Sequence, residues 1–249
     1  MTGNTGSSTR SNAGAGAALI EQFARIYVVN LPARADRRVE VEAELGRYGL
    51  SLSHAQVTLF AAIRPEDQGA FPNIGTRGCF MSHLAILEAI AAGDEPAGLI
   101  LEDDADFTPA LAEGMIAAAA TEWDLIYGYP GGAEHGDAQG MVALTPKTDV
   151  LTTHFIAVKR GAAALIVPYF RAMLERPLGD PDGGPMHVDG AYNWFRRAHP
   201  QMRAFSLLPE VARQRPSKTD IHTTSWFDRV AALAPALVIV RRIKRRLRG

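Results

Sequence analysis

The stretch from 98 to 107 joins a short apolar run to a cluster of carboxylates. Gly98 to Leu101 are apolar, and four acids follow within five residues: Glu102, Asp103, Asp104 and Asp106. Such a run predicts a buried strand of an α/β sheet with the acids at its carboxyl end, where open α/β sheets bind ligands. The acids could hold a divalent cation, which prefers oxygen ligands and offsets their mutual repulsion. Alternatively, they follow the strand into a solvated loop and cap the next helix.

Composition limits the classes of protein that this chain can belong to. Its 249 residues carry a net charge of −1, and 47% of them are hydrophobic, which favours one α/β domain and no nucleic-acid partner. The one cysteine, Cys79, excludes a disulfide framework and suits a reducing compartment. No apolar run reaches the ~18 residues of a spanning helix or forms the core of a signal peptide, so we expect a cytoplasmic protein.

We expect three parts along the chain. Residues 1–20 are rich in Gly, Ser, Thr, Asn and Ala and predict a disordered leader. Residues 21–228 form the folded domain, and 229–249 form a basic amphipathic tail. Within the domain the patterns predict strands at 25–31, 57–62, 98–101, 123–129 and 152–158, and helices at 37–48, about 80–91 and 160–174, the last kinked or broken at Pro168. The polar loop from 130 to 140 is either a mobile lid or an exposed variable loop.

Two further segments carry polar side chains next to predicted elements. Arg34 and Arg37 follow the first strand, where a nucleotide is often held, although they would also suit a solvated helix start. Ser82 and His83 lie in the first turns of a helix entered through a Gly-rich segment. A histidine in such a position is either a site residue or a hydrogen-bonded structural residue.

Taken together, these segments resemble glycosyltransferase family 25, which holds lipopolysaccharide and lipooligosaccharide galactosyltransferases and collagen hydroxylysine galactosyltransferases. The resemblance rests on Ile26-Tyr27-Val28-Val29-Asn30-Leu31 with Arg34, Asp36 and Arg37; on Gly78-Cys79 with Ser82-His83-Leu84; on Leu101-Glu102-Asp103-Asp104; and on the later segments Val188-Asp189-Gly190 and 214–221. The chain departs from the pattern at Thr76-Arg77, where relatives usually carry an acid and an apolar residue.

The resemblance implies a GT-A-type fold, in which a Rossmann-like mixed sheet flanked by helices binds a nucleotide-sugar together with Mn²⁺ or Mg²⁺. It implies Asp104 as the direct metal ligand with Glu102 next, while Asp106 ranks lower. The residues that it assigns to substrate binding in the first three motifs are Asn30, Leu31, Arg34, Arg37, Ser82, His83 and Asp103.

The same resemblance suggests a catalytic base. Relatives invert the anomeric centre, so a carboxylate must take the proton of the attacking acceptor hydroxyl, and Asp189 matches the acidic position. An acid at a helix start could equally serve as a cap for free N–H groups. His154, near the start of a predicted strand, could face the acceptor.

The C-terminal segments are polar and then basic. The family resemblance implies that Arg215 and Lys218 could pair with phosphate oxygens and that Asp220 or His222 could complete the metal coordination. Apart from the resemblance, this segment reads as a solvated loop. From 235 to 248 an apolar patch precedes clustered Lys and Arg, which suits attachment to an anionic membrane surface. A solubilising tail or a nucleic-acid patch is the alternative. Glycolipid acceptors would lie at the inner face of the cytoplasmic membrane.

These observations predict a metal-dependent inverting glycosyltransferase. We expect it to move a hexose, with galactose from UDP-galactose preferred, onto a lipopolysaccharide or other glycan acceptor. One alternative is another nucleotide-sugar enzyme on the same fold. Another is a catalytically inert glycan-binding or membrane-associated protein that keeps the fold.

Overall fold

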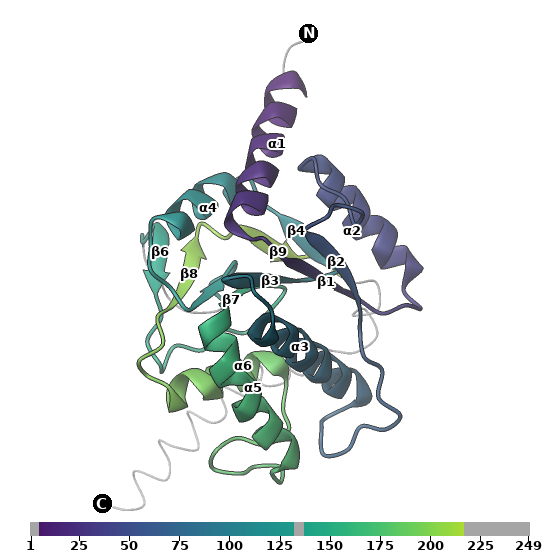
Figure 1. Cartoon of the computed structure of the whole chain (residues 1–249), viewed down its shortest axis with the longest axis vertical. Coiled ribbons are helices and arrows are strands. Elements are labelled where there is room, and N and C mark those ends of the chain that lie inside the picture. The colour runs from purple at the N-terminus through teal and green to yellow at the C-terminus, as the bar shows by residue number, and fades with distance from the viewer. Residues whose placement is uncertain (1–4, 132–136, 217–249) are drawn as a thin grey trace, which may run out of the picture. The chain divides into compact units, whose positions relative to one another are not determined.

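The computed structural model describes residues 5–131 and 137–216, which fold around a seven-stranded mixed sheet (Figure 1). The sheet has the order β2-β1-β3-β7-β5-β8-β6. Its strands are β1 (Ile26–Asn30), β2 (Val57–Ala61), β3 (Ala97–Glu102), β5 (Leu125–Tyr127), β6 (Gly140–Ala143), β7 (Phe155–Lys159) and β8 (Ala204–Leu208). A separate ribbon pairs β4 (Ala105–Phe107) with β9 (Ala212–Gln214). The helices are α1 (Thr5–Gln22), α2 (Ala35–Arg47), α3 (Ile74–Ala92), α4 (Leu111–Ala119), α5 (Arg160–Glu175) and α6 (Val188–Ala198).

Strand directions bring several chain segments to one edge of the sheet. β1 is parallel to β2 and β3, and β5 is parallel to β8, whereas β7 runs antiparallel to both β3 and β5. The carboxyl ends of β1, β3 and β5 therefore lie at the same edge as the start of β7. This arrangement confirms the predicted Rossmann-like mixed α/β sheet flanked by helices.

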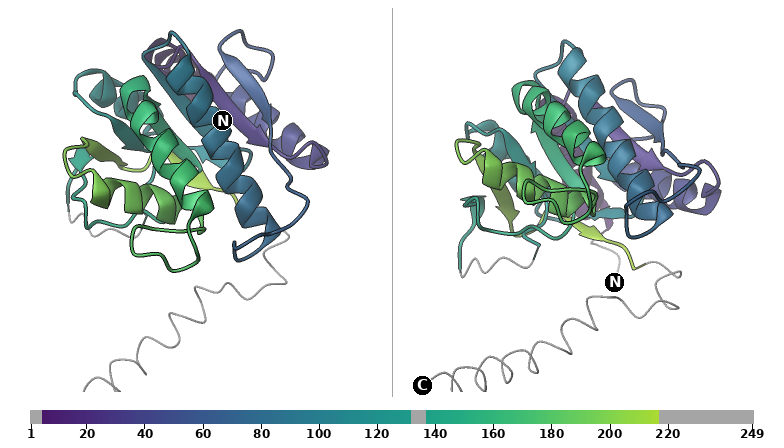
Figure 2. Two further views of the ribbon diagram at one scale, coloured as in Figure 1. Left: turned by 60° about the horizontal axis from the view of Figure 1, so that its bottom comes forward. Right: turned by 90° about the horizontal axis from the view of Figure 1, so that it is seen from below.

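Helices cover both faces of the sheet (Figures 1 and 2). Helices α1, α2 and α4 pack on one face, and α3, α5 and α6 pack on the other. Successive side chains of a strand point to opposite faces of the sheet, so each central strand contributes to both hydrophobic cores. In β7, Phe155 and Ala157 belong to the core under α1, α2 and α4, while Ile156 and Val158 belong to the core under α3, α5 and α6. Burial on both faces explains why the central strands read as continuous apolar runs.

The expected disordered leader is wrong for the residues that the structure describes. Residues from Thr5 onward form α1, and Ala15, Leu19 and Phe23 are buried in the core under α1, α2 and α4. These three recur every four residues, so they form one stripe of a helix. A Cβ on Gly16 would lie only 1.9 Å from the Tyr48 carbonyl oxygen, so glycine lets α1 approach the end of α2 closely. The polar composition of the segment concealed this stripe.

The boundaries of the other predicted elements lie closer to those in the structure. The strand expected from 152 begins at Phe155, and α5 is a single helix that includes Pro168, so of the two alternatives, a kink or a break, the break is excluded. The compact unit ends at Gln214. The predicted domain end at 228 and the tail 229–249 lie outside the described residues, as does 132–136 of the suggested lid. Among the described helices, none combines the length and apolar character needed to cross a membrane.

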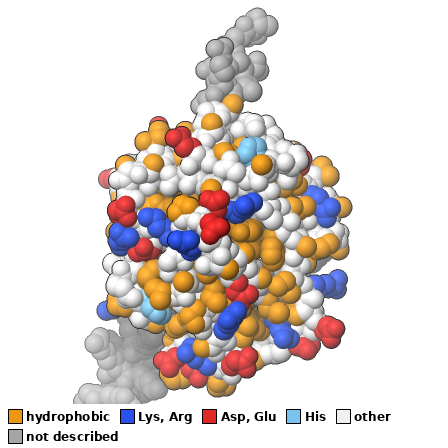
Figure 3. Space-filling model, viewed as in Figure 1, with side chains coloured by type: hydrophobic (Ala, Val, Ile, Leu, Met, Phe, Trp, Pro, Cys, Tyr) orange, Lys and Arg blue, Asp and Glu red, His pale blue; other side chains and the backbone are white. Residues whose placement is uncertain are grey.

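Charges of both signs are mixed on the face of the molecule that Figure 3 shows. In the space-filling view, acidic and basic side chains lie interspersed between apolar ones, so that face of the described residues carries no extended basic area (Figure 3).

Candidate functional site

The edge where β1 and β3 end gathers most of the side chains singled out in the sequence. Asn30 is the last residue of β1 and Glu102 is the last of β3. Asp103 and Asp104 form the turn into β4, and His154 directly precedes β7. The predicted position of the acids at a carboxyl edge is confirmed.

Neighbouring acids of this cluster face opposite layers. Leu101 belongs to the core under α2, and Ile100 belongs to the core under α3. Because successive side chains of a strand alternate, Glu102 is directed toward α3 and Asp103 toward α2. The sequence motif therefore supplies two distinct groups of polar side chains.

The group on the α2 side is centred on Arg37. Its Nη1 donates to Asp103 Oδ1 at 2.8 Å and to Asp104 Oδ2 at 3.1 Å. Asn30 Nδ2 donates to Asp103 Oδ2 at 2.7 Å, and Arg38 donates to Asn30 Oδ1 at 3.3 Å. Both oxygens of Asp103 are thus held by protein donors, while Arg37 balances part of the negative charge.

Asp104 is less completely compensated than Asp103. Its Oδ2 accepts from Arg37 and, at 3.3 Å, from Gln214 Nε2, but its buried Oδ1 has no hydrogen-bond partner within the described parts of the chain. Burial, followed by repulsion from Glu102, raises the pKa of Asp104 to about 6. An unpartnered, desolvated carboxylate oxygen among other carboxylates is a donor that a hard divalent cation would fit. Asp104 is accordingly the best candidate for the predicted Mn²⁺ or Mg²⁺ ligand.

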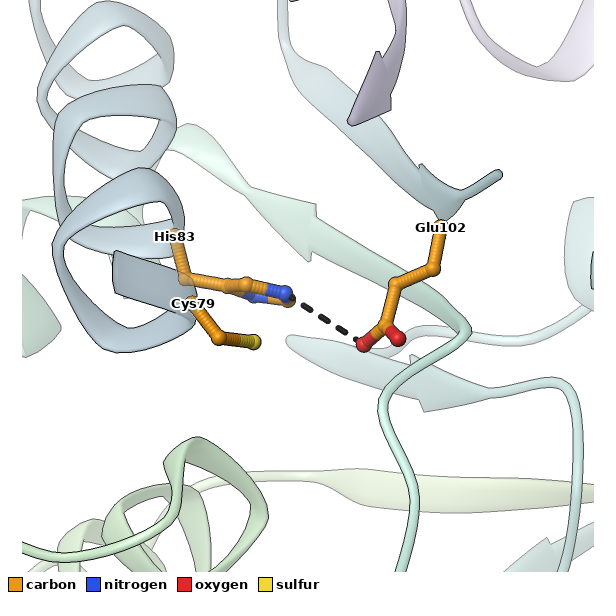
Figure 4. Close-up of side chains that lie close together, drawn as sticks. All are labelled: Cys79, His83 and Glu102. Carbon is orange, nitrogen blue, oxygen red and sulfur yellow. Dashed lines mark ion pairs between the residues drawn. The ribbon is translucent and has the colours of Figure 1, made fainter. Parts of the chain in front are cut away.

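The group on the α3 side contains Glu102, His83 and Cys79 (Figure 4). Glu102 Oε1 lies 3.7 Å from His83 Nε2 and accepts a hydrogen bond of 2.9 Å from Thr153. Burial acts to raise the pKa of Glu102, but the interactions with His83 and Thr153 outweigh it and lower the pKa below its ordinary value. Burial, reinforced by Glu102, raises the pKa of the Cys79 thiol well above its usual range.

Asp189 lies in the first turn of α6, and its carboxylate is mostly buried. Its Oδ1 accepts from the Gly190 N–H at 2.7 Å. Burial raises the pKa of Asp189, and the Glu102 carboxylate raises it further, so the two acids influence each other. A raised pKa strengthens a general base, whereas the bond to Gly190 fits a helix cap. Both predicted roles of Asp189 remain compatible with this geometry.

His154 is buried beside the site. Its Nε2 lies 3.1 Å from the Ala212 carbonyl oxygen, which fixes Nε2 as the protonated nitrogen, and its Nδ1 has no partner among the described residues. The ring contacts Tyr129 at a centroid distance of 5.6 Å. Burial lowers the pKa of His154, so its neutral form is favoured at neutral pH. Contact with an acceptor stays a prediction.

Ser82 has a structural role in this fold, and its expected substrate contact stays a prediction. It is fully buried, and its hydroxyl donates to the Gly78 carbonyl at 2.7 Å while accepting from the Ile63 N–H at 2.8 Å. Both hydrogen-bonding functions are therefore used to hold the loop after β2 against α3.

Several other expected ligands stay predictions. Arg34 forms an ion pair with Asp36, and Leu31 is 40% exposed in the loop after β1. Arg215 falls in the unit that begins after Gln214. Lys218, Asp220 and His222 lie outside the described residues.

Sequence reasoning missed three contributors to the two groups. Thr153 orients Glu102, Gln214 contacts Asp104, and the Tyr192 hydroxyl lies 3.4 Å from His83 Nδ1. Tyr192 carried a sequence signal, because it lies three residues after Asp189 and therefore on a neighbouring part of the same helix face, and Gln214 begins the family-like segment 214–221. The other two contacts depend on strand pairing across the fold.

Comparison with known proteins assigns the chain to no family. No protein-family model matches the chain, and a search of curated proteins finds no match either.

Proposed function

We propose that this protein is a metal-dependent inverting glycosyltransferase of the GT-A type, similar to family 25. The observation that carries the proposal is the arrangement around Asp104, a buried carboxylate with an unpartnered oxygen at the carboxyl edge of a Rossmann-like sheet. Interactions between Asn30 and Asp103, between His83 and Glu102, and between Glu102 and Asp189 link four of the family-like segments, which supports the proposal. The proposed donor is a UDP-hexose, with UDP-galactose preferred, and the acceptor is a lipopolysaccharide or other glycan.

Each residue has a separate task in this proposal. Asp104, with Glu102 next, would hold Mn²⁺ or Mg²⁺, which when bound supplies a Lewis acid that neutralises charge on the departing diphosphate. Asp103 is fixed in place by Asn30 and Arg37 and would orient the donor's ribose. Asp189 would take the proton of the acceptor hydroxyl on its carboxylate oxygen as that hydroxyl attacks the anomeric carbon.

Calorimetric titration tests the donor site directly. UDP-galactose, UDP-glucose and UDP-N-acetylglucosamine would be titrated into the full chain with and without Mn²⁺. We expect one donor to bind only with the metal, and we expect Asp104→Asn to lose this binding. The absence of binding by every donor to folded protein would contradict the proposal.

Turnover separates the proposed base from the metal ligand. Asp189→Asn should keep metal-dependent donor binding and lose about 10²- to 10⁴-fold in transfer rate, the usual contribution of a general base. A variant that transfers sugar at the original rate would leave Asp189 only its role at the start of α6.

One observation favours a catalytically inert glycan-binding protein as the second candidate. Arg37 already pairs with Asp103 and Asp104, as it could in a fold that no longer binds a metal. An inert binder should keep its glycan affinity in Asp104→Asn, whereas an enzyme should lose metal binding and turnover together. Peripheral attachment to an anionic membrane through residues 235–248 is proposed from the sequence pattern alone.

A further inference from the structure

Three side chains that can bind a metal converge between α3 and β3. One donor atom from each of Cys79, His83 and Glu102 lies within 4.8 Å of the others, and the three side chains point toward one another (Figure 4). Cys79 and His83 are four residues apart on α3, so they lie on one face of the helix. Glu102 reaches them from the end of β3.

One ring nitrogen of the buried His83 side chain has no hydrogen-bond partner among the described residues. This nitrogen is Nε2, and the side chain that carries it is fully buried. The 3.7 Å to Glu102 Oε1 exceeds hydrogen-bonding distance. Leaving such an atom unpaired is costly, and a metal ion between the two atoms would satisfy both.

Outer contacts hold two of the donors in position. The Tyr192 hydroxyl lies 3.4 Å from His83 Nδ1; if Nδ1 carries the ring proton, Nε2 presents its lone pair to the cluster. The Thr153 hydroxyl donates to Glu102 Oε1 at 2.9 Å. Hydrogen bonds of this kind orient ligands in metal sites.

The donor atoms select the class of metal. Sulfur, imidazole nitrogen and one carboxylate oxygen suit zinc-like transition metals, whereas Mn²⁺ and Mg²⁺ prefer all-oxygen sets. Zinc bonds of about 2.0–2.3 Å in a tetrahedron place ligand atoms roughly 3.3–3.6 Å apart. The His83–Glu102 separation of 3.7 Å is already close to this range, and the Cys79 sulfur, which lies within 4.8 Å of the other two donor atoms, would have to move inward on binding.

We propose that Cys79, His83 and Glu102 form a site for a zinc-like transition metal, with a fourth position left for water or an exogenous ligand. The site shares Glu102 with the all-oxygen site proposed at Asp104, but its other two ligands, Cys79 and His83, belong to it alone. The Glu102 oxygen in this site is Oε1, which lies 3.7 Å from His83 Nε2 and accepts a hydrogen bond from Thr153. The proposal goes beyond glycosyl transfer and does not depend on it.

Cobalt(II) is a suitable probe, because thiolate coordination produces a ligand-to-metal charge-transfer band. Cys79 is the one cysteine of the chain, so such a band reports this residue alone. The full chain, reduced and without an affinity tag, would be titrated with Co²⁺ and then with Zn²⁺. We expect the charge-transfer band to saturate at one Co²⁺ per chain and Zn²⁺ to remove the band by displacing that ion.

Variants distinguish this site from the rest of the acidic cluster. Cys79→Ser should abolish the band, and His83→Gln should weaken Co²⁺ binding at least tenfold. Tyr192→Phe, which removes only the orienting hydroxyl, should weaken it by roughly tenfold. Asp104→Asn is the matched control and should keep the band unchanged. Circular dichroism would establish that each variant is folded.

Two results would overturn the proposal. One is folded wild-type protein that shows no charge-transfer band with Co²⁺, and the other is folded His83→Gln protein whose band saturates at the same Co²⁺ concentration as that of the wild type. No nucleotide-sugar enters this experiment. A cobalt band without donor binding would therefore remove the transferase proposal alone, and donor binding without a band would remove the metal-site proposal alone.

Discussion

Replacing Asp104 with Asn should stabilise the metal-free protein at neutral pH. The Asp104 side chain is only 9% exposed, and both of its donors, Arg37 and Gln214, bond to the same oxygen, Oδ2. An asparagine amide can place its oxygen there and its NH₂ at the unpartnered position. The substitution therefore removes a charge and leaves both hydrogen bonds available.

The pKa of Asp104 sets the size of this effect. Its rise from 3.8 to about 6 corresponds to about 3 kcal/mol, at 1.36 kcal/mol for each pKa unit. Because the folded state binds the proton more tightly, stability is fully present below about pH 4 and is lost as the pH rises through about 6. We expect a gain of up to ~3 kcal/mol for Asp104→Asn above pH 7, and about half of that at pH 5.

Urea unfolding in the presence of a chelator measures this difference at pH 5 and pH 7.5. Asp103→Asn is the matched comparison, because both Asp103 oxygens accept hydrogen bonds and an amide must lose one, at a cost of about 1–3 kcal/mol. Adding Mn²⁺ should stabilise the wild type and leave Asp104→Asn unchanged. An Asp104→Asn variant that is less stable at pH 7.5, or a difference that does not change with pH, would refute the reasoning.

Two further pairs of substitutions test the packing of the fold. Gly78→Ala would place a Cβ 2.5 Å from the Ile63 carbonyl oxygen, so we expect it to lower the free energy of unfolding by about 1–3 kcal/mol. Gly46→Ala, whose Cβ would have no neighbour within 4 Å, should raise that free energy by up to about 1 kcal/mol. Urea unfolding of both variants measures this contrast. Asn193→Ala removes the buried hydrogen bonds that Asn193 makes to the N–H and the carbonyl of Val150, in the loop before β7, and should cost about 2–4 kcal/mol by thermal or urea unfolding. Asp149→Ala, which breaks only an exposed ion pair, should cost less than about 1 kcal/mol, and equal losses in these two variants would contradict the account.

Much of the architecture could be predicted because short-range patterns carry it. The apolar run before Glu102 predicted β3, and helical spacing after Arg37 and Arg160 predicted α2 and α5. The position of the acids at a carboxyl edge follows from strand direction alone. The N-terminal helix was missed because its apolar stripe is narrow and its other residues are small and polar.

The sequence by itself therefore determined five strands of the main sheet, helices α2, α3 and α5, the α/β class and the location of the acidic cluster. Only the tertiary structure decided how that cluster divides, since adjacent side chains at a strand end face opposite layers. Asp103 and Asp104 meet Arg37 from α2, whereas Glu102 meets His83 from α3. Partners separated by 66 residues or more in the chain leave no local pattern, because pairing and packing alone bring Arg37 to Asp103 and Gln214 to Asp104.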